Sequence, residues 1–449
     1  MSLLRFEPVG AWDESTGITK SEIESFHAPL SEIREHAGTF DRAEELLLQY
    51  EARREKSELG RVFRVANRLH DHLDAVAVIG EASRLLGPAA LMDAICEPYH
   101  NELSRAARGS KPRMVFAAGG IDNDSVEGLL RRMRTSEYAC VRNDPISQPS
   151  ERYAIVAVDG ADDETSESTA ITMTLLADQL ASGLADSASR WMPKLVVPIV
   201  RRSSPLDRAA SSVPCDEVFL IEENENKIGD PFGVFSAATL LPAAFLGLDC
   251  IQFLVGAAAM NRHYLTSAPS ENLVMRLVAT QCAWARFHGR PNSVLSVWSP
   301  ALLRTGQWIE QAMNRKQSRS MRTGSELRMG SEWAGDLSDD VLTHHLIVEK
   351  ERTDPVSIPN RLLPAEASAL TIADRMRTTI ERAGGVLSRH RHPATRIILP
   401  ELTPHGLGQL FQFVTIASEL SGRVADLVKD PGLDGSFTRS TTMRLGEST

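Results

Sequence analysis

The sequence is poor in aromatic residues and has neither a long uninterrupted hydrophobic run nor closely spaced cysteines. Aromatic side chains make up 6% of the 449 residues. The most apolar stretch, 232–248, contains Pro242 and runs into Asp249, whereas a membrane span needs about 20 apolar residues. We therefore expect a buried helix there and no membrane association. The five cysteines lie far apart with no CxxC spacing, which argues against a zinc ribbon and a disulfide framework.

The sequence also lacks an excess of positive charge. Acidic residues number 59 and basic residues 49, so the net charge is -10. Affinity for nucleic acid comes from a positive surface, so we expect no nucleic-acid partner. Residues 1–17 show no basic region followed by an apolar one, so we predict no secretory signal and a cytoplasmic location. We expect neither a cofactor nor a bound metal.

What the sequence does have is the composition of a globular protein, with 42% hydrophobic and 24% charged residues. Its length fits two domains. Residues 41–70 place apolar side chains at helical spacing, which predicts one or two long amphipathic helices. We predict an N-terminal helical arm, two domains and a C-terminal tail, in this order: 1–72, 73–212, 213–420 and 421–449.

Short apolar runs alternate with helical stretches in both predicted domains, at 75–79, 113–117, 153–158, 194–200, 293–298, 346–348 and 396–399. This alternation predicts an α/β fold with two doubly wound parallel sheets. The polar stretch 313–340 predicts a long surface loop. Because such sheets bind ligands beyond the carboxyl ends of their strands, we expect ligands at the loops after Val78, Val158 and Trp298.

Three stretches resemble the phosphoglucose isomerase family, whose members contain two sugar-isomerase (SIS) domains. Residues 78–91 (VIGEASRLLGPAAL) are similar to the family's GxGGSxLGPxAL. Residues 232–249 resemble the LLPAA segment that follows the family's GGR signature, and 400–435 resemble its closing helix and DQPGVE segment. The order and spacing of the three stretches agree with the family, so the chain is identified as a divergent member.

The resemblance implies the interconversion of glucose 6-phosphate and fructose 6-phosphate in glycolysis and gluconeogenesis. It also implies binding of a sugar phosphate or a related small molecule, and a homodimer. The reaction needs a carboxylate base, an acid/base group for ring opening, a cation near the enediolate and a phosphate cradle.

Most of the family's catalytic positions carry other residue types here. The resemblance aligns the base with Arg315, which cannot act as a base at neutral pH. Glu310, the nearest carboxylate, lies five residues earlier and on a different part of the same predicted helix. The GGR arginine aligns with Pro231 and the C-terminal lysine with Phe437, so both cations are lost.

Two residues remain as candidates for catalysis. The family's ring-opening histidine aligns with Leu342, and His344 would share the Leu342 face of a strand. Arg439 follows Phe437 by two residues and could bring a cation to a similar place. An ordinary strand-edge histidine and a surface arginine on the tail are the alternatives.

The phosphate cradle departs most from the family. Its Ser-Lys-Ser/Thr loop corresponds to 159–166 (DGADDETS), where acids replace donors. A carboxylate about 4 Å from a phosphate charge costs about 1 kcal/mol in water and about 4 kcal/mol at an effective dielectric of 20. In the first loop, 80–84, a hydroxyl and a guanidinium still offer donors. The substrate-binding candidates that remain are Gly80, Ser83, Arg84, Thr165 and Ser166.

Three functions stay open. The sequence favours a pseudoenzyme, a catalytically degenerate family member that binds a sugar derivative or a protein partner. The alternative is an active isomerase with relocated catalytic residues. A third is an enzyme whose acidic loop, 159–164, faces a cationic ligand or a cation such as Mg²⁺ or Ca²⁺.

Overall fold

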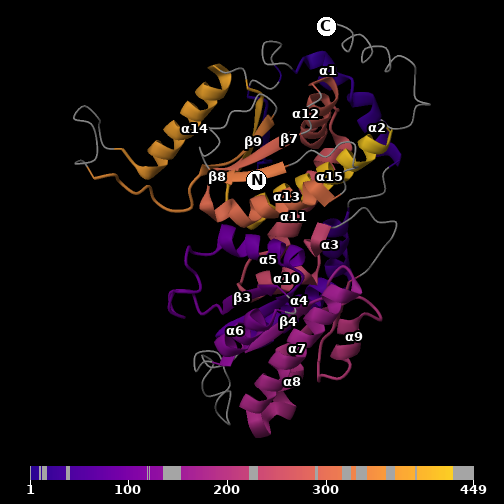
Figure 1. Cartoon of the computed structure of the whole chain (residues 1–449), viewed down its shortest axis with the longest axis vertical. Helices are drawn as coiled ribbons and strands as arrows, with labels where there is room; N and C mark the ends of the chain where they lie inside the picture. Colours follow the sequence, from indigo (N-terminus) through magenta and orange to yellow (C-terminus); the bar gives the residue numbers. More distant parts are fainter. Residues whose placement is uncertain are drawn as a thin grey trace.

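The structure is a computed structural model that describes residues 2–9, 12, 18–36, 41–118, 120, 122–134, 153–221, 231–288, 292–315, 325–329, 341–359, 370–389 and 392–427. These residues form two five-stranded sheets with helices packed around them. Figure 1 shows the two sheets stacked along the long axis of the molecule, with α5, α10 and α11 between them. The predicted fold class is confirmed.

The first sheet is parallel throughout and has the order β3-β2-β4-β5-β6. Every residue of β2, β4 and β5 is buried, because helices cover both faces. This burial explains why their sequences are continuous apolar runs. The strands are β2 (Ala75–Gly80), β3 (Arg113–Ala118), β4 (Tyr153–Val158), β5 (Val196–Val200) and β6 (Phe219–Leu220).

The second sheet has the order β1-β10-β9-β7-β8, with only β1 antiparallel to its neighbour. Its strands are β1 (Arg5–Glu7), β7 (Asn292–Val297), β8 (Ser325–Met329), β9 (Val341–Lys350) and β10 (Ala394–Glu401). The surface loop predicted at 313–340 is therefore wrong at β8. Strand β8 lies at the sheet edge and pairs on one side only, which a polar sequence tolerates.

The described residues before the first sheet form the helices α1 (Lys20–Glu24), α2 (His27–His36), α3 (Arg42–Arg53) and α4 (Glu58–Leu69). The helical prediction for 41–70 is confirmed by α3 and α4. The arm also contributes β1, which pairs with β10 at the other end of the chain. Short 3-10 turns occur at η1 (Arg54–Lys56), η2 (His70–His72), η4 (Ala185–Ser187), η5 (Pro231–Gly233) and η6 (Pro300–Leu302).

The remaining helices cover the sheets or lie between them. Helices α5 (Ala82–Ile95), α6 (Asn123–Arg134), α7 (Asp163–Leu184), α8 (Ala188–Leu195) and α9 (Pro205–Ala210) belong to the first sheet. Helices α10 (Ala237–Phe245), α11 (Cys250–Thr266), α12 (Leu273–His288), α13 (Leu303–Arg315), α14 (Ile372–Arg389) and α15 (Pro404–Leu427) follow. The predicted buried helix is confirmed by α10. The domain limits stay a prediction, and the first sheet includes residues 219 and 220.

Candidate functional site

The first sheet has a crevice where the connections between its strands change direction. Strand β2 leads to β3 on one side and β4 leads to β5 on the other, so their carboxyl ends form the switch point at which such sheets bind ligands. Gly80 and Val158 pair at this point. A Cβ atom at Gly80 would lie 2.6 Å from the Val158 carbonyl oxygen, so only glycine fits. The resemblance places the phosphate cradle here.

A carboxylate of the chain itself occupies this crevice. Glu81, which directly precedes α5, accepts a 2.8 Å hydrogen bond from the Ala161 amide. Its Oε1 accepts a 2.5 Å bond from the Ser83 hydroxyl, and Arg84 Nε lies 3.8 Å from Oε2, the oxygen that the Ala161 amide contacts. Two of the predicted ligand residues, Ser83 and Arg84, thus face Glu81. Sequence reasoning missed Glu81, although an acid inside a glycine-rich phosphate loop is a signal.

The two hydroxyls of the second loop also bond within the chain. Thr165 and Asp162 form a capping box at the start of α7, with the Thr165 amide 2.8 Å from Asp162 Oδ1. The Thr165 amide and hydroxyl lower the pKa of Asp162. Ser166 is buried, and its hydroxyl accepts a 3.1 Å bond from the Leu206 amide. Both hydroxyls therefore support local structure.

The acids of this loop point to different partners. Asp159 is buried, and its Oδ2 accepts bonds of 2.7 Å from the Arg201 amide and 2.5 Å from the Ser204 hydroxyl. Asp163 lies 3.3 Å from Arg201 Nη2. Within the described ranges, no three His, Cys, Asp or Glu side chains lie close enough to hold a metal ion. The geometry gives no support to a cation site at 159–164.

His344 lies on β9, inside the second domain. Its Nδ1 is 2.6 Å from Thr395 Oγ1, and its Nε2 is 3.2 Å from Gln281 Nε2 on α12. The Gln281 amide nitrogen can only donate, so Nε2 accepts and Nδ1 carries the proton. Burial lowers the pKa of His344 to about 4. The His344 ring is therefore buried, neutral and hydrogen-bonded through both nitrogens. Its role in catalysis stays a prediction.

Burial of His344 makes the fold sensitive to acid. The pKa is about 4 when folded and 6.5 ordinarily, so the unfolded chain binds more protons in this interval and stability falls as pH decreases through it. In urea titrations, we expect a His344→Leu variant to lose about 2 kcal/mol less than the parent between pH 7 and pH 5. Parallel pH profiles for the two proteins would contradict this.

The other residues that the sequence analysis considered for catalysis lie outside the described residues or near the ends of described segments. Arg439 and Phe437 lie outside them. Arg315 is the last residue of α13, Glu310 lies in the same helix, and Pro231 opens η5. Their catalytic roles stay predictions.

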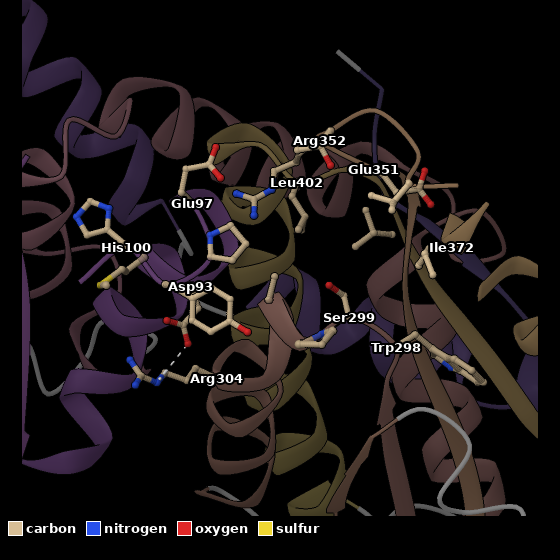
Figure 2. Close-up of a pocket in the computed structure, with 18 of the residues that line it drawn as sticks. Asp93, Glu97, His100, Trp298, Ser299, Arg304, Glu351, Arg352, Ile372 and Leu402 are labelled. Carbon is tan, nitrogen blue, oxygen red and sulfur yellow. Dashed lines mark ion pairs between the residues drawn. The ribbon is translucent and has the colours of Figure 1, made fainter. Parts of the chain in front are cut away.

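A second crevice lies between the two domains, at the opposite end of α5. It is a cavity of about 910 Å³ lined by residues of α5, the segment 97–102, and the residues that follow β7 and β9. Figure 2 shows Asp93 and Arg304 on one side of it and Trp298 and Ile372 on the other. The loop after Trp298, a ligand position expected from the sequence, lines this cavity, whereas Gly80, Ser83, Arg84, Thr165, Ser166 and His344 do not.

Two contacts join the domains at this cavity. Asp93 lies 3.3 Å from Arg304 Nε, and burial raises the pKa of Asp93 although Arg304 opposes the shift. Arg352 donates a 3.0 Å hydrogen bond to the Cys96 carbonyl oxygen at the end of α5. Sequence reasoning missed these residues, although it named the loop after Trp298 as a ligand position.

Comparison with known proteins agrees with the resemblance. No family model matches the chain. A glucose-6-phosphate isomerase of Clostridium novyi is 21% identical over 406 residues, 88% of this chain and 84% of the relative. One from Pediococcus pentosaceus is 20% identical over 380 residues, 82% of this chain and 79% of the relative.

Solved structures share the fold over most of the chain. A hypothetical protein of Thermus thermophilus has a TM-score of 0.71 at 18% identity, covering 94% of both chains. A glucose-6-phosphate isomerase of Chlamydia trachomatis has a TM-score of 0.62 at 16% identity, covering 92% of this chain and 81% of the other. Among the described helices, none is long and apolar enough to cross a membrane. Over most of its length the chain is thus similar in sequence to glucose-6-phosphate isomerases and shares their fold, as a divergent relative.

Proposed function

We propose that this chain is a non-catalytic member of its family, which binds a sugar derivative or a partner without isomerising glucose 6-phosphate. The observation that carries the proposal is Glu81, whose carboxylate lies on the Ala161 amide and the Ser83 hydroxyl. These donors stand where the resemblance places the phosphate cradle. A phosphate entering the crevice would meet this carboxylate instead of free donors.

Electrostatics oppose a phosphate in this position. Each negative charge of the phosphate, about 4 Å from Glu81, would cost about 4 kcal/mol at an effective dielectric of 20. A second carboxylate follows the same pattern, because Glu58 of α4 accepts a 3.0 Å bond from the Ala237 amide at the start of α10. In many proteins backbone amides at helix N-termini bind anionic ligands. Here the corresponding amides donate to carboxylates of the chain itself.

Removing the Glu81 carboxylate is expected to restore an anion site. In a Glu81→Ala variant the Ala161 amide and the Ser83 hydroxyl lose their acceptor, so inorganic phosphate can take its place. We expect millimolar phosphate to raise the melting temperature of this variant and to leave the parent unchanged. Calorimetric titration with phosphate then gives the affinity.

A matched control separates the crevice from a general change of charge. Glu167 is an exposed acid on α7, and a Glu167→Ala variant carries the same change in net charge. It is expected to respond to phosphate as the parent does. Phosphate binding by the parent with the affinity of Glu81→Ala would overturn the proposal, because the carboxylate would then not close the cradle.

A further inference from the structure

The second sheet has an open crevice at the position where the first sheet has an occupied one. Strand β7 leads to β8 in one direction and β9 leads to β10 in the other, so their carboxyl ends form a switch point. Residues 298–301 and 351–356, which follow these strands, line the 910 Å³ cavity together with Lys350 at the end of β9. Its volume lies within the range of about 300–1,000 Å³ typical of small-molecule sites. A ligand is expected here on topological grounds.

Tyr99 stands at this cavity in a backbone conformation that tyrosine rarely adopts. Its φ angle is 62°, and its side chain is 80% exposed. Glycine adopts a positive φ without strain, and an exposed ring adds nothing to core packing. Strained residues that persist without a packing role occur at ligand sites. The exposed ring and its backbone conformation make Tyr99 a candidate ligand contact.

Apolar side chains surround the same space. Of the ten large hydrophobic side chains that are exposed among the described residues, four line the cavity: Tyr99, Val356, Ile372 and Met376. On the far wall, the indole of Trp298 is held by a 3.0 Å hydrogen bond from its Nε1 to His345 Nδ1. A concentration of exposed apolar surface around a cavity marks a binding site.

The polar groups of the cavity favour neither sign of ligand charge. Among the described lining residues, five carboxylates stand beside four cations: Asp93, Glu97, Glu102, Glu351 and Asp354 against Arg132, Arg304, Lys350 and Arg352. The turn η6 at the cavity offers few backbone donors for a phosphate. Pro300 has no N–H, and the Leu302 amide already donates to the Ser299 carbonyl oxygen at 2.9 Å. Paired acids and bases instead match hydroxyl groups, which both donate and accept.

We propose that this cavity binds an uncharged carbohydrate. The C–H face of a sugar ring packs on Tyr99, and its hydroxyls bond to Asp93, Arg304 and Arg352, which Figure 2 shows at the cavity. The site extends the proposed non-catalytic function but stands on separate residues, since α5 begins at the occupied crevice and ends at the open one. An uncharged sugar also distinguishes this site from the phosphate cradle of the relatives.

The test uses a substitution that the fold should accept. Saturation-transfer NMR and calorimetric titration of the full chain with maltose, cellobiose, chitobiose and glucose 6-phosphate measure binding. We expect at least one uncharged disaccharide to bind more tightly than glucose 6-phosphate. A Tyr99→Gly variant should weaken that binding at least tenfold, while its urea midpoint stays equal or rises because the strain at φ 62° is relieved. Asp93→Asn should weaken it as well.

A Leu48→Ala variant is the matched control, because Leu48 is an exposed apolar residue on α3 that does not line the cavity. It should leave sugar affinity unchanged. Three results would overturn the site: no binding of any uncharged probe at millimolar concentration, tighter binding of glucose 6-phosphate, or full affinity in Tyr99→Gly. Isomerase turnover would instead refute the non-catalytic function and leave this site standing.

Discussion

Purified protein is expected to interconvert fructose 6-phosphate and glucose 6-phosphate at least about 10⁴-fold more slowly than an active relative assayed beside it. Loss of a general base alone commonly lowers the rate about 10²–10⁴-fold, and the position aligned with the base holds Arg315. The occupied cradle adds a separate loss, because Glu81 holds the Ala161 amide. A coupled assay that follows glucose 6-phosphate through its dehydrogenase measures this rate.

The isomerase of Clostridium novyi is the positive control for this assay. Glu81→Ala should not restore turnover, because it opens the cradle without supplying a base. Robust turnover by the parent would contradict the proposal. If that turnover disappeared in a folded His344→Gln variant, the active alternative with relocated catalytic residues would be correct.

The two parallel sheets could be predicted because burial on both faces leaves a clear pattern. Residues 75–79 and 153–158 are continuous apolar runs, and they form the central strands β2 and β4. Strand β8 was missed because Ser325–Met329 lies in a polar stretch and pairs at an edge. Strand β1 was not predicted because its three residues are too few to show the alternation of apolar and polar side chains typical of a strand. Its pairing partner on β10, which includes Ile398, is also remote in the sequence.

The candidate sites were predictable only where one strand end defined them. The expectation of ligand positions after Val78, Val158 and Trp298 rests on a rule for parallel sheets that needs no tertiary contact. The groups that decide the chemistry come from elsewhere in the chain. Glu81 meets the Ala161 amide 80 residues away, and Asp93 meets Arg304 across the domain boundary. Because no local sequence pattern indicates such long-range pairs, the occupied crevice and the open one could be identified only from the three-dimensional structure.

Asp74→Asn is expected to destabilise the fold by about 3–5 kcal/mol, because Asp74 is the buried anion that holds three arginines together. It lies 2.9 Å from Arg108 and 3.8 Å from Arg105, and it also pairs with Arg113. The Arg108 side chain is 0% exposed, so its charge has no access to water once the carboxylate is gone.

The arginine cluster also shapes one wall of the open cavity. Arg108 donates to the Leu103 and Lys111 carbonyls, and Arg113 donates to the Asn101 carbonyl, so the cluster holds the segment that carries Tyr99. Urea unfolding measures the loss of stability, and hydrogen exchange should show the earliest opening at 97–112. The control is Asp216→Asn, which removes the exposed ion pair between Asp216 and Arg68, whose atoms lie 3.0 Å apart. This variant should lose less than about 1 kcal/mol of stability. Equal losses for the two variants would mean that Asp74 is not the anchor of the cluster, and the position of Tyr99 would then need another support.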